Sequence, residues 1–248
     1  MKSKFTKWSF RIFLLLLLVS AGLGATTQPV DKISPPHRIP QEDISASMEA
    51  EFDSLYKIFG KNKVMPKQLE KQIIYALSFF PELIDTKIEF RLTKSTDGII
   101  STRPFIGSVL KRASKRTYLV LINDTTSSRR MPSFVNGPVN GQVGILGHEL
   151  CHIVYFSHRN SFGLIGLGVA HISTPFMDRF ENKTDSMDIE RGLGHQLISW
   201  VEYLHKGFRA MVGENQPLPF EEKPGRERYM SVESIRRVMK GSDVYRGE

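Results

Sequence analysis

Residues 141–156 read GQVGILGHELCHIVYF and hold one carboxylate and two histidines among mostly apolar side chains. The apolar positions flank the polar group on both sides, and no other charge interrupts the stretch, so we expect a long buried helix. Buried imidazoles and a buried carboxylate need a compensating partner, and a metal ion suits both. Gly144 and Gly147 weaken such a helix by about 1 kcal/mol each, which suggests that they permit a close backbone approach.

The polar group itself has the sequence His148-Glu149-Leu150-Cys151-His152, an H-E-x-x-H motif. On a helix, His148 and His152 share one face, so both imidazoles can reach one metal ion. Glu149 is turned away by about 100°, close enough to take a proton from a metal-bound water. Catalytic Zn²⁺ keeps three protein ligands and one open position. The motif therefore predicts Zn²⁺ on His148 and His152 with Glu149 as general base, against the alternative of two buried histidines with structural partners only.

The third ligand has more than one candidate. His158 has the spacing that metzincin proteases use, but that pattern needs a glycine hinge where this chain has Tyr155. Glu181 is favoured instead, because Asp185 follows it one helical turn later and could orient a ligating histidine. Ligation by Asp185 or Asp188 is a further alternative, and an exposed acidic helix start is the structural explanation of the same cluster.

His148-Glu149-Leu150-Cys151-His152 followed by Glu181-x-x-x-Asp185 resembles the gluzincin branch of zinc metallopeptidases, the thermolysin-like and CAAX-prenyl-protease-like enzymes. The resemblance implies a zincin fold, in which the motif helix and a glutamate-bearing helix pack beneath a small sheet. It implies Zn²⁺ ligation by His148, His152 and Glu181, catalysis by Glu149, and an outer carboxylate at Asp185. It also implies that strand 118–122 is the edge strand that pairs with an extended peptide.

The rest of the chain predicts an α+β fold in one domain, residues 43–248. Helical spacing of apolar residues indicates helices at 43–59 and from 66 to 80. Strict alternation at 87–92 predicts a half-buried strand, and 99–102 and 118–122 are further strand candidates. The pattern is helical after 141, except for a glycine-rich stretch at 163–168 that we expect to be core or loop. An amphipathic helix is expected within 229–240.

The N-terminus predicts export. Residues 1–25 combine a basic start, an apolar run and small residues, the order of a secretory signal peptide, and 26–42 follow as a linker or short propeptide. If residues 1–25 are not removed, they would tether the chain to a membrane. Four of the 34 basic residues and none of the 26 acidic residues lie in 1–25, which leaves a net charge of +4, too mild to predict nucleic-acid binding. A sequon at Asn182, beside Glu181, favours a bacterial, periplasmic or secreted protein, since a glycan there would crowd the site.

The function predicted from these residues is hydrolysis of a peptide or protein substrate by a zinc-bound water that Glu149 activates. Two alternatives share the site: a non-catalytic zinc-containing envelope protein, and a zinc hydrolase of a non-peptide amide. The oxyanion stabiliser is open among His195, Tyr203, His205 and Tyr229. His171 is expected in a loop, Cys151 is expected to be a small buried apolar residue, and the sequence does not fix the oligomeric state.

Overall fold

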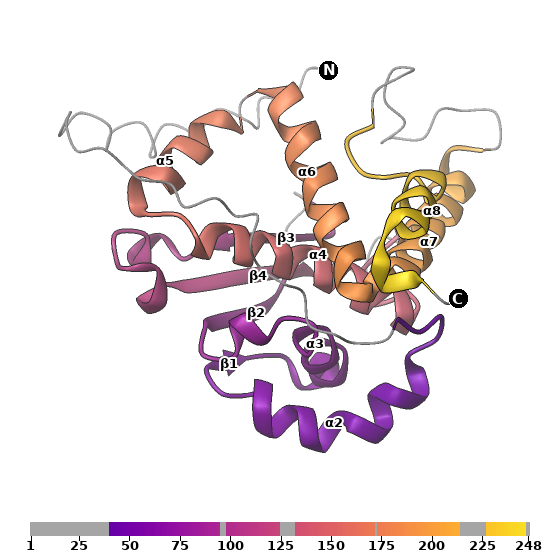
Figure 1. Cartoon of the computed structure of the whole chain (residues 1–248), viewed down its shortest axis with the longest axis horizontal. Coiled ribbons are helices and arrows are strands. Elements are labelled where there is room, and N and C mark those ends of the chain that lie inside the picture. The colour runs from indigo at the N-terminus through magenta and orange to yellow at the C-terminus, as the bar shows by residue number, and fades with distance from the viewer. Residues whose placement is uncertain (1–39, 95–97, 125–131, 172, 214–226, 247–248) are drawn as a thin grey trace.

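The computed structural model describes residues 40–94, 98–124, 132–171, 173–213 and 227–246 (Figure 1). The predicted signal peptide and the linker up to residue 39 lie outside them. Helices and one small sheet make up the described part, which confirms an α+β fold. The helices are α2 (Ser45–Phe59), α3 (Glu70–Leu77), α4 (Val139–Ser157), α5 (Ser161–Ala170), α6 (Thr174–Asp188), α7 (Gly194–Val212) and α8 (Val232–Gly241). The strands are β1 (Lys63–Val64), β2 (Lys87–Thr93), β3 (Ile100–Pro104) and β4 (Thr117–Asn123).

The first two helices of the described residues form the base of the molecule in Figure 1, with α2 laid across α3. α2 closely matches the helix expected at 43–59. The helix expected from 66 to 80 is shorter: it starts as a 3₁₀ turn, Lys67–Leu69, and α3 ends at Leu77. Ile73 and Ile74 of α3 are completely buried, so α3 belongs to the core and α2 covers it.

The sheet has the strand order β1-β2-β4-β3, in which β1, β2 and β4 are parallel and β3 runs antiparallel to β4. The alternation predicted at 87–92 is confirmed, because Ile88 and Phe90 are buried while Lys87 and Arg91 are exposed. The expectation that 118–122 is an edge strand is wrong. β4 lies between β2 and β3, and the edge strands of the described sheet are β1 and β3. A continuous apolar run indicates that a strand is covered on both faces, but it does not indicate which strands flank it.

α4 runs through the centre of the molecule and packs against α3, α6, α7 and β3. Every residue from Gly141 to Phe156 is buried, as the sequence predicts. The close approach expected at the α4 glycines is also confirmed. A Cβ on Gly144 would lie 2.5 Å from the Leu197 backbone nitrogen of α7, and one on Gly147 would lie 2.2 Å from an oxygen of Asp188.

The glycine-rich stretch after α4 is a helix, which corrects the expectation that helical structure is interrupted at 163–168. α5 contains three glycines, but it buries Leu164 and Leu167 against the main core. Packing of these side chains outweighs the propensity cost of the glycines.

α6 passes into α7 through a π-helical turn, Ile189–Leu193. Gly192 adopts φ 94° there, in the left-handed region, and the chain changes direction at this kink. α8 confirms the amphipathic helix expected within 229–240, and it packs on α7 through Ile235 and Met239. Among the described residues no helix is both long and apolar enough to cross a membrane.

Gly144→Ala is expected to lower the free energy of unfolding by about 1–3 kcal/mol, because the methyl group would force α4 and α7 apart. Gly166→Ala is the matched control: Gly166 is exposed on α5, and a Cβ at this position would meet no atom within 4 Å, so we expect a gain of about 0.5–1 kcal/mol. Urea denaturation of both variants measures the difference. Equal stability of the two variants would contradict the close contact between α4 and α7.

Candidate metal centre

Three buried side chains from two helices meet in the interior. His148 and His152 lie one turn apart on α4, and Glu181 reaches them from α6. One potential ligand atom from each residue lies within 4.8 Å of the other two. The Glu181 Oε2 atom is 3.2 Å from His148 Nε2 and 3.4 Å from His152 Nε2. The structure thus brings together the two motif histidines and the glutamate favoured from the sequence.

Asp185 holds His148 from the other side of the ring. His148 Nδ1 and Asp185 Oδ1 are 2.7 Å apart, so the Nδ1–H group donates a hydrogen bond to the carboxylate. The second carboxylate oxygen, Oδ2, accepts the backbone N–H of Met230 at 2.8 Å. With both of its oxygens occupied, Asp185 is fixed in place, and it fixes the tautomer of His148 with the Nε2 lone pair facing Glu181.

Thr184 contacts the Nδ1 side of the His152 ring, as Asp185 contacts that of His148. Its hydroxyl donates to the carbonyl oxygen of Phe180 at 2.9 Å, which leaves the Oγ1 lone pairs as acceptors. His152 Nδ1 is 3.5 Å from this oxygen and can donate to it, so that the His152 Nε2 lone pair also faces Glu181. The Phe180 ring stacks on the His152 ring at 5.0 Å between centroids and limits its rotation.

When both rings are neutral, two nitrogen lone pairs and one carboxylate oxygen therefore converge on the same small buried volume. Such an arrangement is repulsive unless a metal ion or protons lie between the three groups. Without a metal ion, a proton on Nε2 of His148 takes that place: burial opposes a charge on this ring, yet hydrogen bonds to Asp185 and Glu181 raise its pKa well above the usual value. Hydrogen bonds from His148 and His152 likewise hold the pKa of Glu181 well below its ordinary range. A divalent metal ion satisfies all three groups, so their chemistry fits a bound metal such as Zn²⁺.

Glu149 lies next to this cluster without joining it. Its side chain is buried, and its Oε2 atom has no hydrogen-bond partner in the described structure. Glu149 and the three clustered residues line a cavity of about 900 Å³. A carboxylate with a free oxygen at such a wall can accept a proton from a molecule inside the cavity.

The other ligand candidates lie elsewhere. α4 continues past Tyr155 without the hinge a third histidine would need, and His158 caps its end with an exposed side chain. Asp188 is fully buried against Gly147, and burial with the nearby Asp185 charge raises its pKa well above the usual value. Cys151 is completely buried, as expected.

The structure separates the four candidates for an oxyanion stabiliser. The Tyr203 hydroxyl donates to the carbonyl of Ser133 at 3.0 Å, and His195 packs edge-on against Tyr245; neither lines the cavity. His205 and Tyr229 do line it.

Tyr229 lies close to the metal cluster. Its ring centroid is 6.1 Å from that of His148. Tyr229 is 51% exposed, but partial burial of its hydroxyl and the negative charges of Glu181 and Glu149 raise the pKa of that hydroxyl, which stays protonated and able to donate. The segment before α8 is held on α6 because Asn182 donates to the carbonyls of Glu227 and Arg228, at 2.7 and 3.0 Å.

Two groups that hold the metal-site residues in place cannot be predicted from the sequence. Thr184 and the Met230 amide act through tertiary contacts that spacing does not show. His171, expected in a loop, follows the end of α5 and lines the cavity, with its ring 5.2 Å from that of Phe180. The position of His171 depends on α5 being a helix, which the glycines of that segment conceal.

No family model, no curated protein and no solved structure matches this chain. The gluzincin resemblance therefore rests on the residues alone. What the structure shows is a buried cluster of His148, His152 and Glu181 that could hold a metal ion.

Proposed function

We propose that the chain is a zinc-dependent peptidase in which His148, His152 and Glu181 hold the metal. The observation that carries the proposal is the pairing of a three-ligand cluster with the free carboxylate oxygen of Glu149 at one cavity wall. A purely structural zinc site has four protein ligands and gains nothing from a buried fifth polar group. Export to a periplasmic or extracellular space belongs to the proposal and rests on the sequence of residues 1–25.

Each residue has a distinct task in this proposal. Zn²⁺, when bound, supplies a Lewis acid that lowers the pKa of water and polarises a carbonyl. Glu149 accepts the proton of the water that attacks the peptide carbonyl carbon. It then returns this proton to the amide nitrogen as the C–N bond breaks, so that a carboxylic acid and an amine leave. Asp185 and Thr184 keep the two imidazoles in the ligating tautomer.

A peptide substrate is supported by the edge of the sheet. Within the described residues β3 pairs with β4 alone, and residues 98–102, which lead into β3 and form its start, line the same cavity as Glu149. An extended peptide can add to such an edge through backbone hydrogen bonds. Leu197, Trp200 and Leu204 of α7 add an apolar wall to the cavity. Backbone pairing and an apolar wall together favour a peptide over a small amide.

The proposal is tested by incubating the zinc-loaded protein with a mixture of unrelated peptides and identifying products by mass spectrometry. We expect new peptide termini that disappear with a chelator and return with Zn²⁺. Cleavage of simple amides without cleavage of any peptide would favour the non-peptide hydrolase. A zinc-loaded, folded protein that hydrolyses neither would favour the non-catalytic alternative.

Tyr229→Phe is expected to lower kcat about 100-fold with little change in KM, because the hydroxyl would stabilise negative charge that develops on the substrate oxygen only in the transition state. Tyr203→Phe removes a hydroxyl bonded outside the cavity and serves as the control. Kinetics on one cleaved peptide measure both variants. An unchanged kcat in Tyr229→Phe would remove this residue from the proposed reaction.

A further inference from the structure

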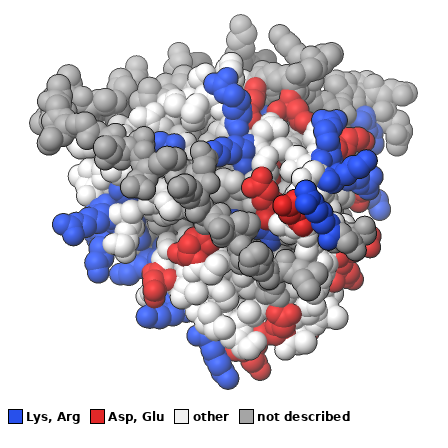
Figure 2. Space-filling model, in the orientation of Figure 1, with Lys and Arg blue, Asp and Glu red and all other residues white. Residues whose placement is uncertain are grey.

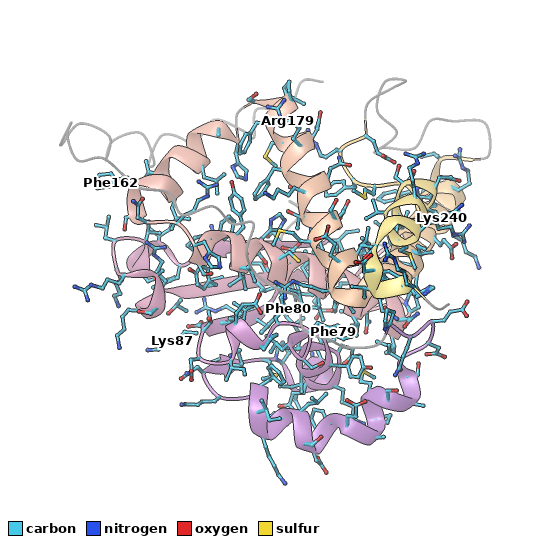
Figure 3. All side chains as sticks on the ribbon, in the orientation of Figure 1. Phe79, Phe80, Lys87, Phe162, Arg179 and Lys240 are labelled. Atoms are coloured by element: carbon cyan, nitrogen blue, oxygen red, sulfur yellow. The ribbon has the colours of Figure 1, made fainter. Side chains whose placement is uncertain are left out.

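Exposed apolar side chains from two segments of the chain gather at one end of the molecule. Phe105, Ile106 and Leu110 lie in the connection between β3 and β4 and are 44%, 66% and 81% exposed. Phe162, at the start of α5, is 61% exposed. Figure 3 shows Phe162 at the outer edge of the molecule. Residues 105–115 and 158–162 are called the apolar tip below.

The two segments of the apolar tip are tied to each other. Ser161 Oγ donates to the carbonyl of Val109 at 2.8 Å, which places Leu110 and Phe162 on adjoining backbone. The buried guanidinium of Arg116 donates to the carbonyls of Lys111 and Arg159, one from each segment. These hydrogen bonds hold the two segments in a fixed arrangement, so the apolar tip is an ordered surface.

The charged residues of the apolar tip are all basic. Residues 98–123 and 150–177 contain no Asp or Glu. Lys111, Arg112 and Lys115 are exposed beside the apolar side chains, and Arg159 is partly exposed. Figure 2 shows Lys and Arg side chains gathered at the left edge of the view, on the side where Figure 1 places the connection between β3 and β4.

We propose that the apolar tip docks on the surface of an anionic lipid bilayer. Apolar side chains enter the boundary between headgroups and acyl chains, while lysine and arginine beside them attract anionic headgroups. Exposed apolar groups beside an excess of positive charge fit an anionic bilayer better than a second copy of the chain. The tip of a second copy would carry the same positive charge and repel the first.

Docking at the tip would place the cavity close to the membrane. α5 starts in the tip at Ser161, and His171, which follows its last turn, lines the cavity. Ten helical residues span about 15 Å, so the cavity wall lies about one short helix away from the lipid surface. This proposal does not depend on metal binding or on peptidase activity.

A fluorescent label tests the proposal on the full chain. The single cysteine, Cys151, is buried, so Leu110→Cys gives a selective attachment point for an environment-sensitive dye. We expect a blue shift with vesicles of phosphatidylcholine containing phosphatidylglycerol, a much smaller one with phosphatidylcholine alone, and loss of the shift at high salt. The same dye on Ser54→Cys of α2 should remain in an aqueous environment. If the emission of the dye at position 110 does not shift, the proposal is overturned. This includes the case in which residues 1–25 alone hold the chain on the vesicle.

Charge reversal supplies the matched comparison. Lys111→Glu with Arg112→Glu and Lys115→Glu is expected to weaken vesicle partitioning at least about 100-fold, since each basic residue near the surface contributes about 1 kcal/mol. The control reverses Lys57, Lys67 and Lys240, three exposed lysines on other surfaces, and should change partitioning only a few-fold. If both triple variants lose vesicle partitioning equally, binding does not depend specifically on the apolar tip, and the proposal is contradicted. A shift that grows with protein concentration without lipid would assign the tip to contacts between copies instead.

Discussion

Replacing Glu149 with glutamine is expected to lower kcat for peptide cleavage by about 10²–10⁴-fold, the usual contribution of a general base. The substitution keeps the shape of the side chain and removes only its ability to accept a proton. Glu149 is not among the three clustered ligand candidates, so metal content should stay at the wild-type value. Steady-state kinetics with metal analysis of the same sample measures both quantities.

Glu190→Gln is the control for Glu149→Gln, since it changes an exposed glutamate outside the cavity. It should leave both kcat and metal content unchanged. Wild-type cleavage by Glu149→Gln would remove the general base from the account. Loss of metal together with activity would instead place Glu149 among the ligands.

Glu181→Ala is expected to weaken Zn²⁺ binding at least about 100-fold, beyond the 10–100-fold typical of an outer partner of a ligand. The variant keeps both histidines but loses the only carboxylate oxygen within reach of both Nε2 atoms among the described residues. Competition with a chromogenic chelator measures the affinity. Zn²⁺ at about 1,000 times its Kd should also stabilise the wild type by about 4 kcal/mol, and this gain should shrink in the variant.

Glu190→Ala is the matched control for Glu181→Ala, because it removes an exposed glutamate from the turn that follows α6. Its Zn²⁺ affinity should equal that of the wild type. Wild-type affinity in Glu181→Ala would transfer the third-ligand role to another residue and contradict the proposed ligand set.

The sequence predicts the centre of the candidate site well because that centre is encoded by local spacing. Four-residue spacing fixes His148 and His152 on one helical face, and the same spacing relates Glu181 to Asp185. Burial of the motif helix also follows from its sequence, since apolar residues surround the polar group. These relations hold within one helix and need no tertiary information.

The parts that the sequence does not predict depend on contacts between elements. The edge position of β3 follows from strand order, which the apolar run in β4 does not determine. α5 is helical because Leu164 and Leu167 are buried, although its glycines favour a loop. Thr184 contributes by its position behind His152, a relation that exists only after α6 has packed on α4.

Metal analysis of the purified wild-type chain tests the central claim most directly, combined with X-ray absorption at the zinc edge. The chain should be incubated with Zn²⁺, dialysed to remove unbound metal, and measured while folded. The account predicts about one Zn²⁺ per chain, with two imidazole nitrogens at about 2.0–2.1 Å and a carboxylate oxygen at about 2.0–2.2 Å. A folded chain that retains no metal, or a zinc site without two imidazole ligands, would contradict it.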